Sequence, residues 1–304
     1  MKSGSAIIPF GGLVRLTTVC GEAVKNGISR FTGDFPRPSV RLSGKRPVFL
    51  RWSVLFFCFL FFSGCAGFTE RAPSKKERSD LFEAGQLISI LKEKNSNLKT
   101  YKGKGKVTFW KKNKKDLIAG AAWVGSDPDR LRFALRSVTG QPLISFSNDG
   151  KWLYLLSHTQ DQFYKKRSTD SNLKRFTTIP IKSVDMVSIL AGRVPVYKHK
   201  YATVIKNSSD DGYVLVLKKR WGNILEKIYL DENKENVRKV ELFGQNGVLA
   251  YRAEFSEMRD VEGYQIPFRL FFSNGAGLAF QLDIDRYWAD VSVSPSVFEM
   301  APPK

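Results

Sequence analysis

SDPDRLRFALRSVTGQPLISFSNDGKWLYLL, residues 126–156, is the stretch of sequence that decides the fold. Three runs within it, residues 130–136, 143–147 and 152–156, are short, largely apolar and close to period two. The turn sequences S-D-P, T-G and N-D-G precede them, and these are the residue types that tight hairpin turns require. The stretch therefore predicts an antiparallel meander.

The same succession of short strands and turns extends in both directions from this stretch. Asp211-Gly212, Asn246-Gly247 and Asn274-Gly275 fit further tight hairpins. The other predicted strands are residues 104–110, 119–124, 201–205, 213–218, 225–230, 237–243, 248–255, 269–273 and 279–287.

Two helices interrupt the strand pattern. Asp80 and Glu83 form a capping-box-like start, and apolar residues at helical spacing follow to about residue 95. A second, short helix is expected over residues 184–191, ended by Gly192. A sheet of this length must curl or close. The sequence therefore predicts a β-rich α+β fold, an open, strongly curved antiparallel β-barrel of about 11 strands with helices across its mouth.

The segment before this domain has the organisation of an export signal. Residues 52–62 are almost entirely apolar, follow Lys45, Arg46 and Arg51, and are too short for a membrane-spanning helix of about 20 residues. Residues 1–44 show no clear periodicity and are long for a signal prelude. They suggest a start codon assigned too far upstream, with a true start near residue 48 or 50.

The sequence F-S-G-C-A at residues 62–66 resembles a lipobox, with Phe62 in place of the usual leucine. Small residues at Ser63 and Gly64 admit the peptidase, and the Cys65 thiol carries the lipid. The alternative is a buried amino-terminal helix with an incidental cysteine. Ala66 after the cysteine favours delivery to the outer membrane, by resemblance to known sorting signals. We thus expect a signal region (1–64), a lipidated tether (65–78) and one domain (79–304).

Charge and cysteine content limit the partners. Removing the first 64 of 304 residues leaves 240, and takes away nine Lys or Arg and two acidic residues, so the net charge falls from +20 to +13. We expect anionic lipid or an acidic protein as partner rather than nucleic acid, because an exported protein meets little of it. No cysteine beyond Cys65 remains for a disulfide, a zinc cluster or a thiol nucleophile. No cofactor is expected except the covalent lipid on Cys65.

Several short motifs have ordinary explanations. The run G-K-G-K at residues 103–106 lacks phosphate-loop spacing and leads into a strand. The lysine-rich run at 111–115 is most simply a solvated hairpin tip, with contact to anionic headgroups as the alternative. His158 and His199 lack metal-ligand spacing, so no metal site is expected.

Carboxylate pairs occur at residues 231–232 and at Asp283 with Asp285. Such pairs can form a glycosidase site, but chance proximity on a β surface explains them better. We expect no catalytic residues.

Several segments follow one another in a distinctive order: P-D-R-L-R-F (128–133), T-G-Q-P-L (139–143), D-G (149–150), I-P-I (179–181), the helix ending near Gly192, and the stretch from G-Y-Q-I-P (263–267) to D-R-Y-W (285–288). This order resembles the LolA/LolB superfamily of lipoprotein carriers and outer-membrane receptors, over most of residues 80–304.

The resemblance implies a hydrophobic cavity between sheet and helices that accepts acyl chains of client lipoproteins from a periplasmic carrier. It also implies a loop at residues 137–140 whose protruding apolar residue hands clients to the bilayer. Thr139 stands at that position, with Val138 beside it. The expected cavity-lining residues, for which ordinary core packing is the alternative, are Phe133, Leu135, Leu143, Phe146, Trp152, Leu156, Met186 and Leu190.

Three classes of function are considered for this chain. The first is a monomeric lipoprotein of the outer membrane, on its periplasmic face, that binds lipid-modified or similar apolar cargo without chemistry. The second is an envelope scaffold that uses the same fold for protein interaction. An enzyme acting on envelope glycans is the third, and it would show clustered polar groups with shifted pKa values in a cleft.

Overall fold

The computed structural model describes residues 75–112, 114–169 and 179–303. The contacts divide the chain after Ser74, and the second unit, which begins at Lys75, holds every described element. Cys65, the signal region and most of the tether lie outside the described residues. Within the described part, no helix is both long and apolar enough to span a bilayer.

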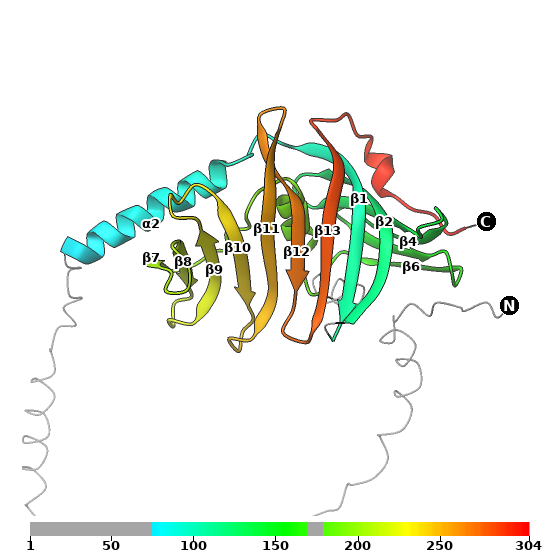
Figure 1. Cartoon of the computed structure of the whole chain (residues 1–304). Coiled ribbons are helices and arrows are strands. Elements are labelled where there is room, and N and C mark those ends of the chain that lie inside the picture. Colours follow the sequence, from blue (N-terminus) through cyan, green and yellow to red (C-terminus); the bar gives the residue numbers. More distant parts are fainter. Residues whose placement is uncertain (1–74, 113, 170–178, 304) are drawn as a thin grey trace, which may run out of the picture. The chain divides into compact units, whose positions relative to one another are not determined.

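A single antiparallel sheet of thirteen strands forms this unit (Figure 1). Its order is β6-β5-β4-β3-β2-β1-β13-β12-β11-β10-β9-β8-β7. The strands are β1 (Thr100–Lys111), β2 (Lys114–Ser126), β3 (Arg130–Arg136), β4 (Pro142–Asn148), β5 (Trp152–Ser157), β6 (Gln162–Arg167), β7 (Tyr201–Lys206), β8 (Tyr213–Lys218), β9 (Ile224–Leu230), β10 (Val237–Phe243), β11 (Leu249–Val261), β12 (Tyr264–Ser273) and β13 (Leu278–Ala289).

The chain builds the sheet as two meanders that meet in its middle. The first half-sheet, β1–β6, runs outward to the edge strand β6; the chain then crosses to the other edge, and the second half-sheet, β7–β13, runs back inward. The seam is the pairing of β1 with β13, whose register shifts between Lys104 and Gly105. The sheet is strongly curved and remains open, because β6 and β7 are not paired with each other.

The predicted meander is confirmed, but the expected count of about 11 strands is wrong. Strand β6 was not predicted, because its sequence Q-F-Y-K-K-R is too polar to show an apolar face. The turn between β11 and β12 was also not predicted. Its Glu262 and Gly263 both have positive φ, 55° and 86°, the backbone conformation of a tight hairpin turn.

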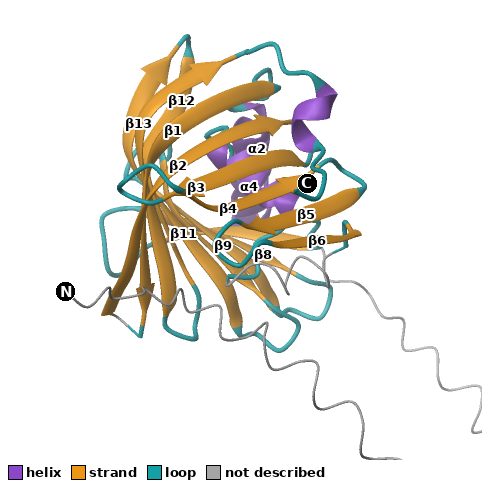
Figure 2. Ribbon diagram, turned by 90° about the vertical axis from the view of Figure 1, so that its right-hand side faces the viewer, coloured by secondary structure: helices purple, strands orange, loops and turns teal. Residues whose placement is uncertain are grey.

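The two helices lie within the curl of the sheet (Figure 2). They are α2 (Lys75–Glu93), which starts earlier than predicted, and α4 (Ser183–Leu190), close to its predicted position. Tyr101 on β1 and Tyr287 on β13 donate hydrogen bonds to the carbonyls of Val187 and Leu190, at 2.8 and 3.0 Å. These bonds identify the face of the sheet that carries Tyr101 as the concave face.

Asn95 fastens both helices to the sheet. Its Nδ2 donates to the carbonyls of Ala191 and Gln265, and its Oδ1 accepts from the Gln265 amide. Gly192 ends α4 with φ +69°, and a Cβ there would lie 2.3 Å from the Gln265 carbonyl oxygen. Only glycine fits so close an approach of backbone to backbone.

The glycines of the G-K-G-K run shape the seam. A Cβ on Gly103 would lie 2.2 Å from the Trp123 ring, and a Cβ on Gly105 would lie 2.1 Å from the Asp283 carbonyl oxygen. The run is therefore part of β1, as expected. The absence of a side chain at Gly103 leaves room for the Trp123 ring of β2, and its absence at Gly105 leaves room for the backbone of β13.

The carboxy-terminal segment covers part of the convex face. It contains the short 3-10 helix η1 (Pro295–Phe298), whose Phe298 is 1% exposed. Ser147 Oγ on β4 donates to the Phe298 carbonyl at 2.6 Å, and Arg132 on β3 donates to the Val297 carbonyl at 2.8 Å. Both faces of β3–β5 are therefore partly covered by other parts of the chain.

Candidate functional site

The concave face of β3 and β4 carries four half-buried apolar side chains. Phe133 is the cross-strand partner of Phe146, and Leu135 is the partner of Ile144. Cross-strand partners share a face of the sheet, so these four form one patch. We call Phe133, Leu135, Ile144 and Phe146 the concave patch.

The structure brings together five of the eight residues predicted to line a cavity. Phe133, Leu135, Phe146 and Met186 are partly buried against the hydrophobic core, and Leu190 is fully buried in it. The last two come from α4, which lies against β2 and β3. The expectation that a sheet face and a helix meet here is therefore met, while the cavity itself stays a prediction.

The other three predicted lining residues, Leu143, Trp152 and Leu156, lie on the opposite face. Successive side chains of a strand point to opposite faces, so Leu143 points away from its neighbour Ile144. Trp152 instead lies beneath the charged groups of Lys165 and Arg167, at 4.9 and 4.5 Å from the ring centre. These three residues cannot line a cavity on the concave face. The prediction failed because β4 and β5 carry apolar side chains on both faces.

Two residues of the concave side were missed. Ile144 follows from strict alternation with Phe146. Trp123 on β2 stacks on Phe133, with ring centres 5.9 Å apart and planes 13° apart. Trp123 is 2% exposed, and its Nε1 has no hydrogen-bond partner among the described residues. Burial of an unpaired indole N–H is unfavourable, so Trp123 is held there by its packing rather than by a hydrogen bond.

The loop between β3 and β4 is the predicted insertion loop. The Ser137 amide donates to the Gln141 carbonyl at 2.8 Å, and the Gly140 amide donates to the Ser137 carbonyl at 2.9 Å. Thr139 Oγ1 is turned back to Ser137 Oγ at 2.8 Å, whereas Val138 is 84% exposed. Val138, rather than Thr139, is therefore the apolar side chain that the loop presents to solvent.

A buried polar cluster lies in the second half-sheet. Asp185 of α4 accepts hydrogen bonds from the hydroxyls of Tyr197 and Tyr251, and Glu226 of β9 accepts from the Tyr197 amide at 3.1 Å. Burial, and to a lesser degree the nearby Asp185, raise the pKa of Glu226 to about 8, although the hydrogen bond from Tyr197 lowers it. Glu226 is thus held as a neutral acid at pH 7.

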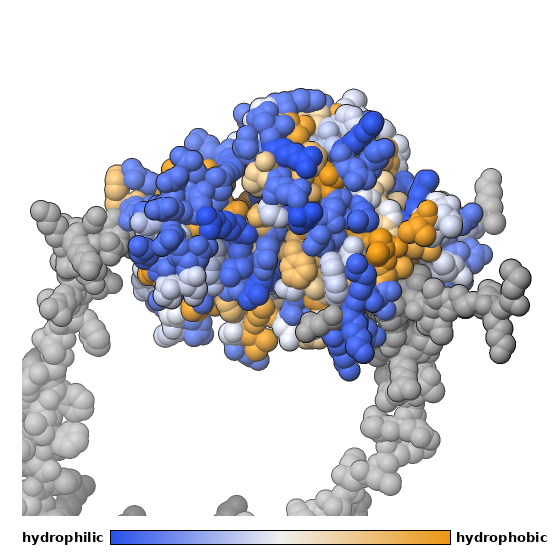
Figure 3. All heavy atoms as spheres, viewed as in Figure 1, coloured by the Kyte–Doolittle hydropathy of each residue, from blue (hydrophilic) through white to orange (hydrophobic). Residues whose placement is uncertain are grey.

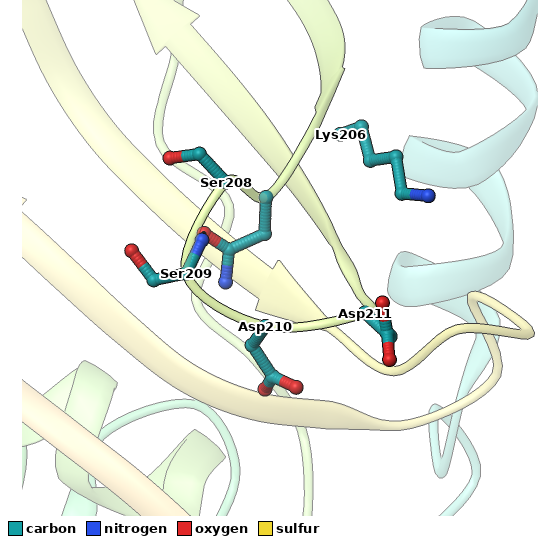
Figure 4. Close-up of a pocket in the computed structure, with 6 residues that line it drawn as sticks. Lys206, Ser208, Ser209, Asp210 and Asp211 are labelled. Atoms are coloured by element: carbon teal, nitrogen blue, oxygen red, sulfur yellow. The ribbon is translucent and has the colours of Figure 1, made fainter.

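Figure 4 shows a solvent-open hollow at the hairpin between β7 and β8. It has a volume of about 780 Å³, and its lining is wholly polar: Lys206, Asn207, Ser208, Ser209, Asp210 and Asp211. Acyl chains need apolar walls, so this hollow does not fit the cargo that the sequence suggests.

The remaining motifs have structural partners. His158 Nε2 lies 3.0 Å from Ser145 Oγ, and His199 Nδ1 lies 2.9 Å from the Tyr197 carbonyl. Asp231 accepts hydrogen bonds within its own turn, and Asp283 forms an ion pair with Arg269 at 2.7 Å. Within the described ranges, no three His, Cys, Asp or Glu residues are grouped as metal ligands.

Comparisons with solved structures identify the fold. No protein-family model and no curated protein sequence matches the chain. A LolA-superfamily protein from Nitrosomonas europaea is similar in structure, with a TM-score of 0.50 and 12% identity over 71% of this chain and 97% of that chain. The chain therefore has a LolA/LolB-like fold.

Two further solved structures show weaker similarity. A domain from Vibrio parahaemolyticus, described as an outer-membrane lipoprotein-sorting protein, has a TM-score of 0.48 and 13% identity over 71% of this chain and 94% of that chain. A DUF1329 family protein from Desulfovibrio piger has a TM-score of 0.47 and 9% identity over 72% of this chain and 97% of that chain.

Proposed function

We propose that this protein is a lipoprotein of the bacterial outer membrane that binds the acyl chains of lipoproteins, or similar apolar cargo, on the concave patch, and so serves lipoprotein localisation. The observation that carries the proposal is the half-buried state of the concave patch in a LolA/LolB-like fold. Along the cross-strand row of Phe272, Ala253 and Val240 in the second half-sheet, by contrast, the apolar side chains of the concave face are fully buried.

The chemistry of the patch suits an acyl chain. Its side chains are aliphatic and aromatic, and each methylene group that they cover contributes about 0.8 kcal/mol. No bond is made or broken in such binding, so the proposed activity needs no catalytic group.

The proposed anchor and exit route follow the sequence. A lipid on Cys65 would tether the domain to the membrane, on its periplasmic face, and two or three acyl chains hold such an anchor firmly. A soluble carrier of the LolA kind would deliver the client. The exposed Val138 would then contact the bilayer as the client leaves.

Binding of a fluorescent acyl probe tests the proposal. The full chain with Cys65→Ser, which lacks the acylation site, is titrated with the probe and then with a lipid-modified peptide as competitor. Ile144→Trp adds bulk to the concave patch, and Leu143→Trp adds the same bulk one residue away on the convex face. We expect Ile144→Trp to weaken probe binding at least about tenfold and Leu143→Trp to leave it within about twofold.

Equal binding by both variants would refute the assignment of the cargo site to the concave patch. If no saturable binding occurs with the folded parent chain, the cargo proposal is wrong, and the envelope scaffold becomes the better explanation of the same fold. Circular dichroism of each variant establishes that it is folded.

A further inference from the structure

Four hairpins lie next to one another along one rim of the sheet. Because every neighbouring pair of strands is antiparallel, the turns β1–β2, β12–β13, β10–β11 and β8–β9 all lie at the same end of their strands. They follow one another along the lower edge of the sheet in Figure 1. The first two are joined directly, since the Lys112 amide donates to the Gly277 carbonyl at 2.8 Å. We call these four turns the lower rim.

The lower rim is strongly basic. The β1–β2 hairpin carries four exposed lysines against one acidic residue, Asp116, and the β8–β9 hairpin adds two half-buried lysines and an exposed arginine. Among the described residues, none of these cations takes part in an ion pair. The cations are Lys111, Lys112, Lys114, Lys115, Lys218, Lys219 and Arg220.

Large apolar side chains stand among these charges. Trp221, at the tip of the β8–β9 hairpin, is 85% exposed, and Val248, in the β10–β11 turn, is 66% exposed. The Arg220 guanidinium lies 6.0 Å from the centre of the Trp221 ring. Figure 3 shows hydrophobic residues beside hydrophilic ones along this edge. An exposed tryptophan next to basic residues is the composition that favours the interface between bilayer and water.

The opposite rim has the opposite charge. Its β7–β8, β9–β10 and β11–β12 turns are rich in carboxylates, with Lys206 and Lys234 as cations among them. The carboxylates in and beside these turns are Asp210, Asp211, Asp231, Glu232, Glu235, Asp260 and Glu262. The charge of the domain is therefore distributed along the strand direction, and an anionic surface attracts one rim and repels the other.

We infer that the lower rim is a docking surface for a bilayer with anionic headgroups. Unpaired lysines meet the headgroup charge, while Trp221 and Val248 enter the interface. The β3–β4 loop leaves the sheet at the same end of its strands. Val138, at the tip of this loop, therefore lies at the same end of the strands as the lower rim. The inference requires neither the lipid on Cys65 nor cargo in the concave patch.

Vesicle binding tests the role of charge. The full chain with Cys65→Ser is sedimented with phosphatidylcholine vesicles that contain either no anionic lipid or about one third phosphatidylglycerol. Lys112→Gln with Lys114→Gln removes two charges from the rim. Lys104→Gln with Lys106→Gln removes two exposed charges from the middle of β1 and is the matched control. We expect the rim pair to lower the affinity for anionic vesicles about tenfold, and the control pair by less than about twofold.

A second pair of variants tests the apolar contact. Trp221→Ser should reduce binding to the anionic vesicles, and it should remove part of the tryptophan quenching by brominated lipids. Phe82→Ser is the control, because Phe82 is 68% exposed on α2, away from the rim. Equal losses in rim and control variants, or equal binding to neutral and anionic vesicles, would overturn the inference.

This test is separate from that of cargo binding. Ile144→Trp should leave vesicle binding unchanged, and Lys112→Gln with Lys114→Gln should leave binding of the acyl probe unchanged. If the parent chain does not bind anionic vesicles but binds an acidic protein or nucleic acid through the same lysines, the inferred membrane partner is wrong.

Discussion

The two half-sheets differ in how deeply the apolar side chains of their concave faces are buried. In the second half-sheet, one cross-strand row runs through Phe272, Ala253, Val240, Ile228 and Leu215, and each of these is 0% exposed. In the first half-sheet, the concave patch is only half-buried. The same alternation of apolar and polar residues thus gives a closed core on one side and accessible apolar surface on the other.

The helices account for part of this difference. Residues Ala84, Leu87 and Leu91 of α2 belong to the core, and α2 packs along β7. Helix α4 reaches β2 and β3. The comparison teaches that one half of a curved sheet can hold a fully buried core while the other half keeps apolar side chains that are only half-buried.

The largest expected effect comes from deleting a ring in each half-sheet. Phe272 is fully buried and stacks on Phe280 at 4.6 Å, so Phe272→Ala should lower the free energy of unfolding by about 4 kcal/mol. Phe146→Ala should cost about 1–2 kcal/mol, because Phe146 is half-buried. Urea denaturation measures both. Equal losses would mean that the half-sheets are packed alike.

Next in size is a change at the seam that joins the half-sheets. Gly105→Ala forces a Cβ against the Asp283 carbonyl oxygen, and neither strand can move without breaking the β1–β13 pairing. We expect a loss of about 3 kcal/mol. Gly120→Ala on β2 is the control, since its nearest atom is 3.8 Å away, and it should change stability by less than about 1 kcal/mol. A tolerated Gly105→Ala would show that the seam can yield.

Glu226 should make the stability of the protein depend on pH. Its pKa is raised from 4.5 to about 8 by burial, so between these values the folded state keeps a proton that the unfolded state releases. The free energy of unfolding therefore falls as pH rises, by about 1 kcal/mol per pH unit. Glu226→Gln should flatten this slope and stabilise the protein at pH 8 by about 2 kcal/mol. An unchanged slope in the variant would contradict the assignment.

The smallest expected effect comes from Asp149 in the first half-sheet. Its contribution to stability changes with pH in the opposite direction to that of Glu226. Partial burial raises the pKa of Asp149, but hydrogen bonds from the amides of Trp152 and Lys151 and from the Tyr154 hydroxyl lower it overall. The contribution of the Asp149 carboxylate to the free energy of unfolding is therefore present above the pKa that this group has in the unfolded chain, and it is lost as pH falls. Asp149→Ala should cost about 1 kcal/mol at pH 7 and less in acid, measured by urea titration. Asp149→Asn, which keeps an acceptor oxygen, should cost less.

Much of the fold was predictable because hairpins are local. The turn sequences at Gly140, Gly150 and Gly247 have the positive φ values that glycine permits, so the residues beside each turn determine which strands pair. Helix α4 was likewise predicted by an apolar run and Gly192. Strand β6 could not be predicted, since its polar sequence forms a strand only because it pairs with β5.

The concave patch was only half predictable, and the reason is geometric. Period two divides a strand into two faces, but it does not say which face is concave when both are apolar, as on β4 and β5. The sequence alone determined the meander, most of its turns, the helix α4 and the basic charge of the rim hairpins. Tertiary structure decided the β1–β13 seam, the concave position of Ile144 rather than Leu143, the burial of Glu226 and the gathering of four distant turns on one rim. Each of these depends on strand pairing or packing between residues far apart in the chain, which a local sequence pattern does not record.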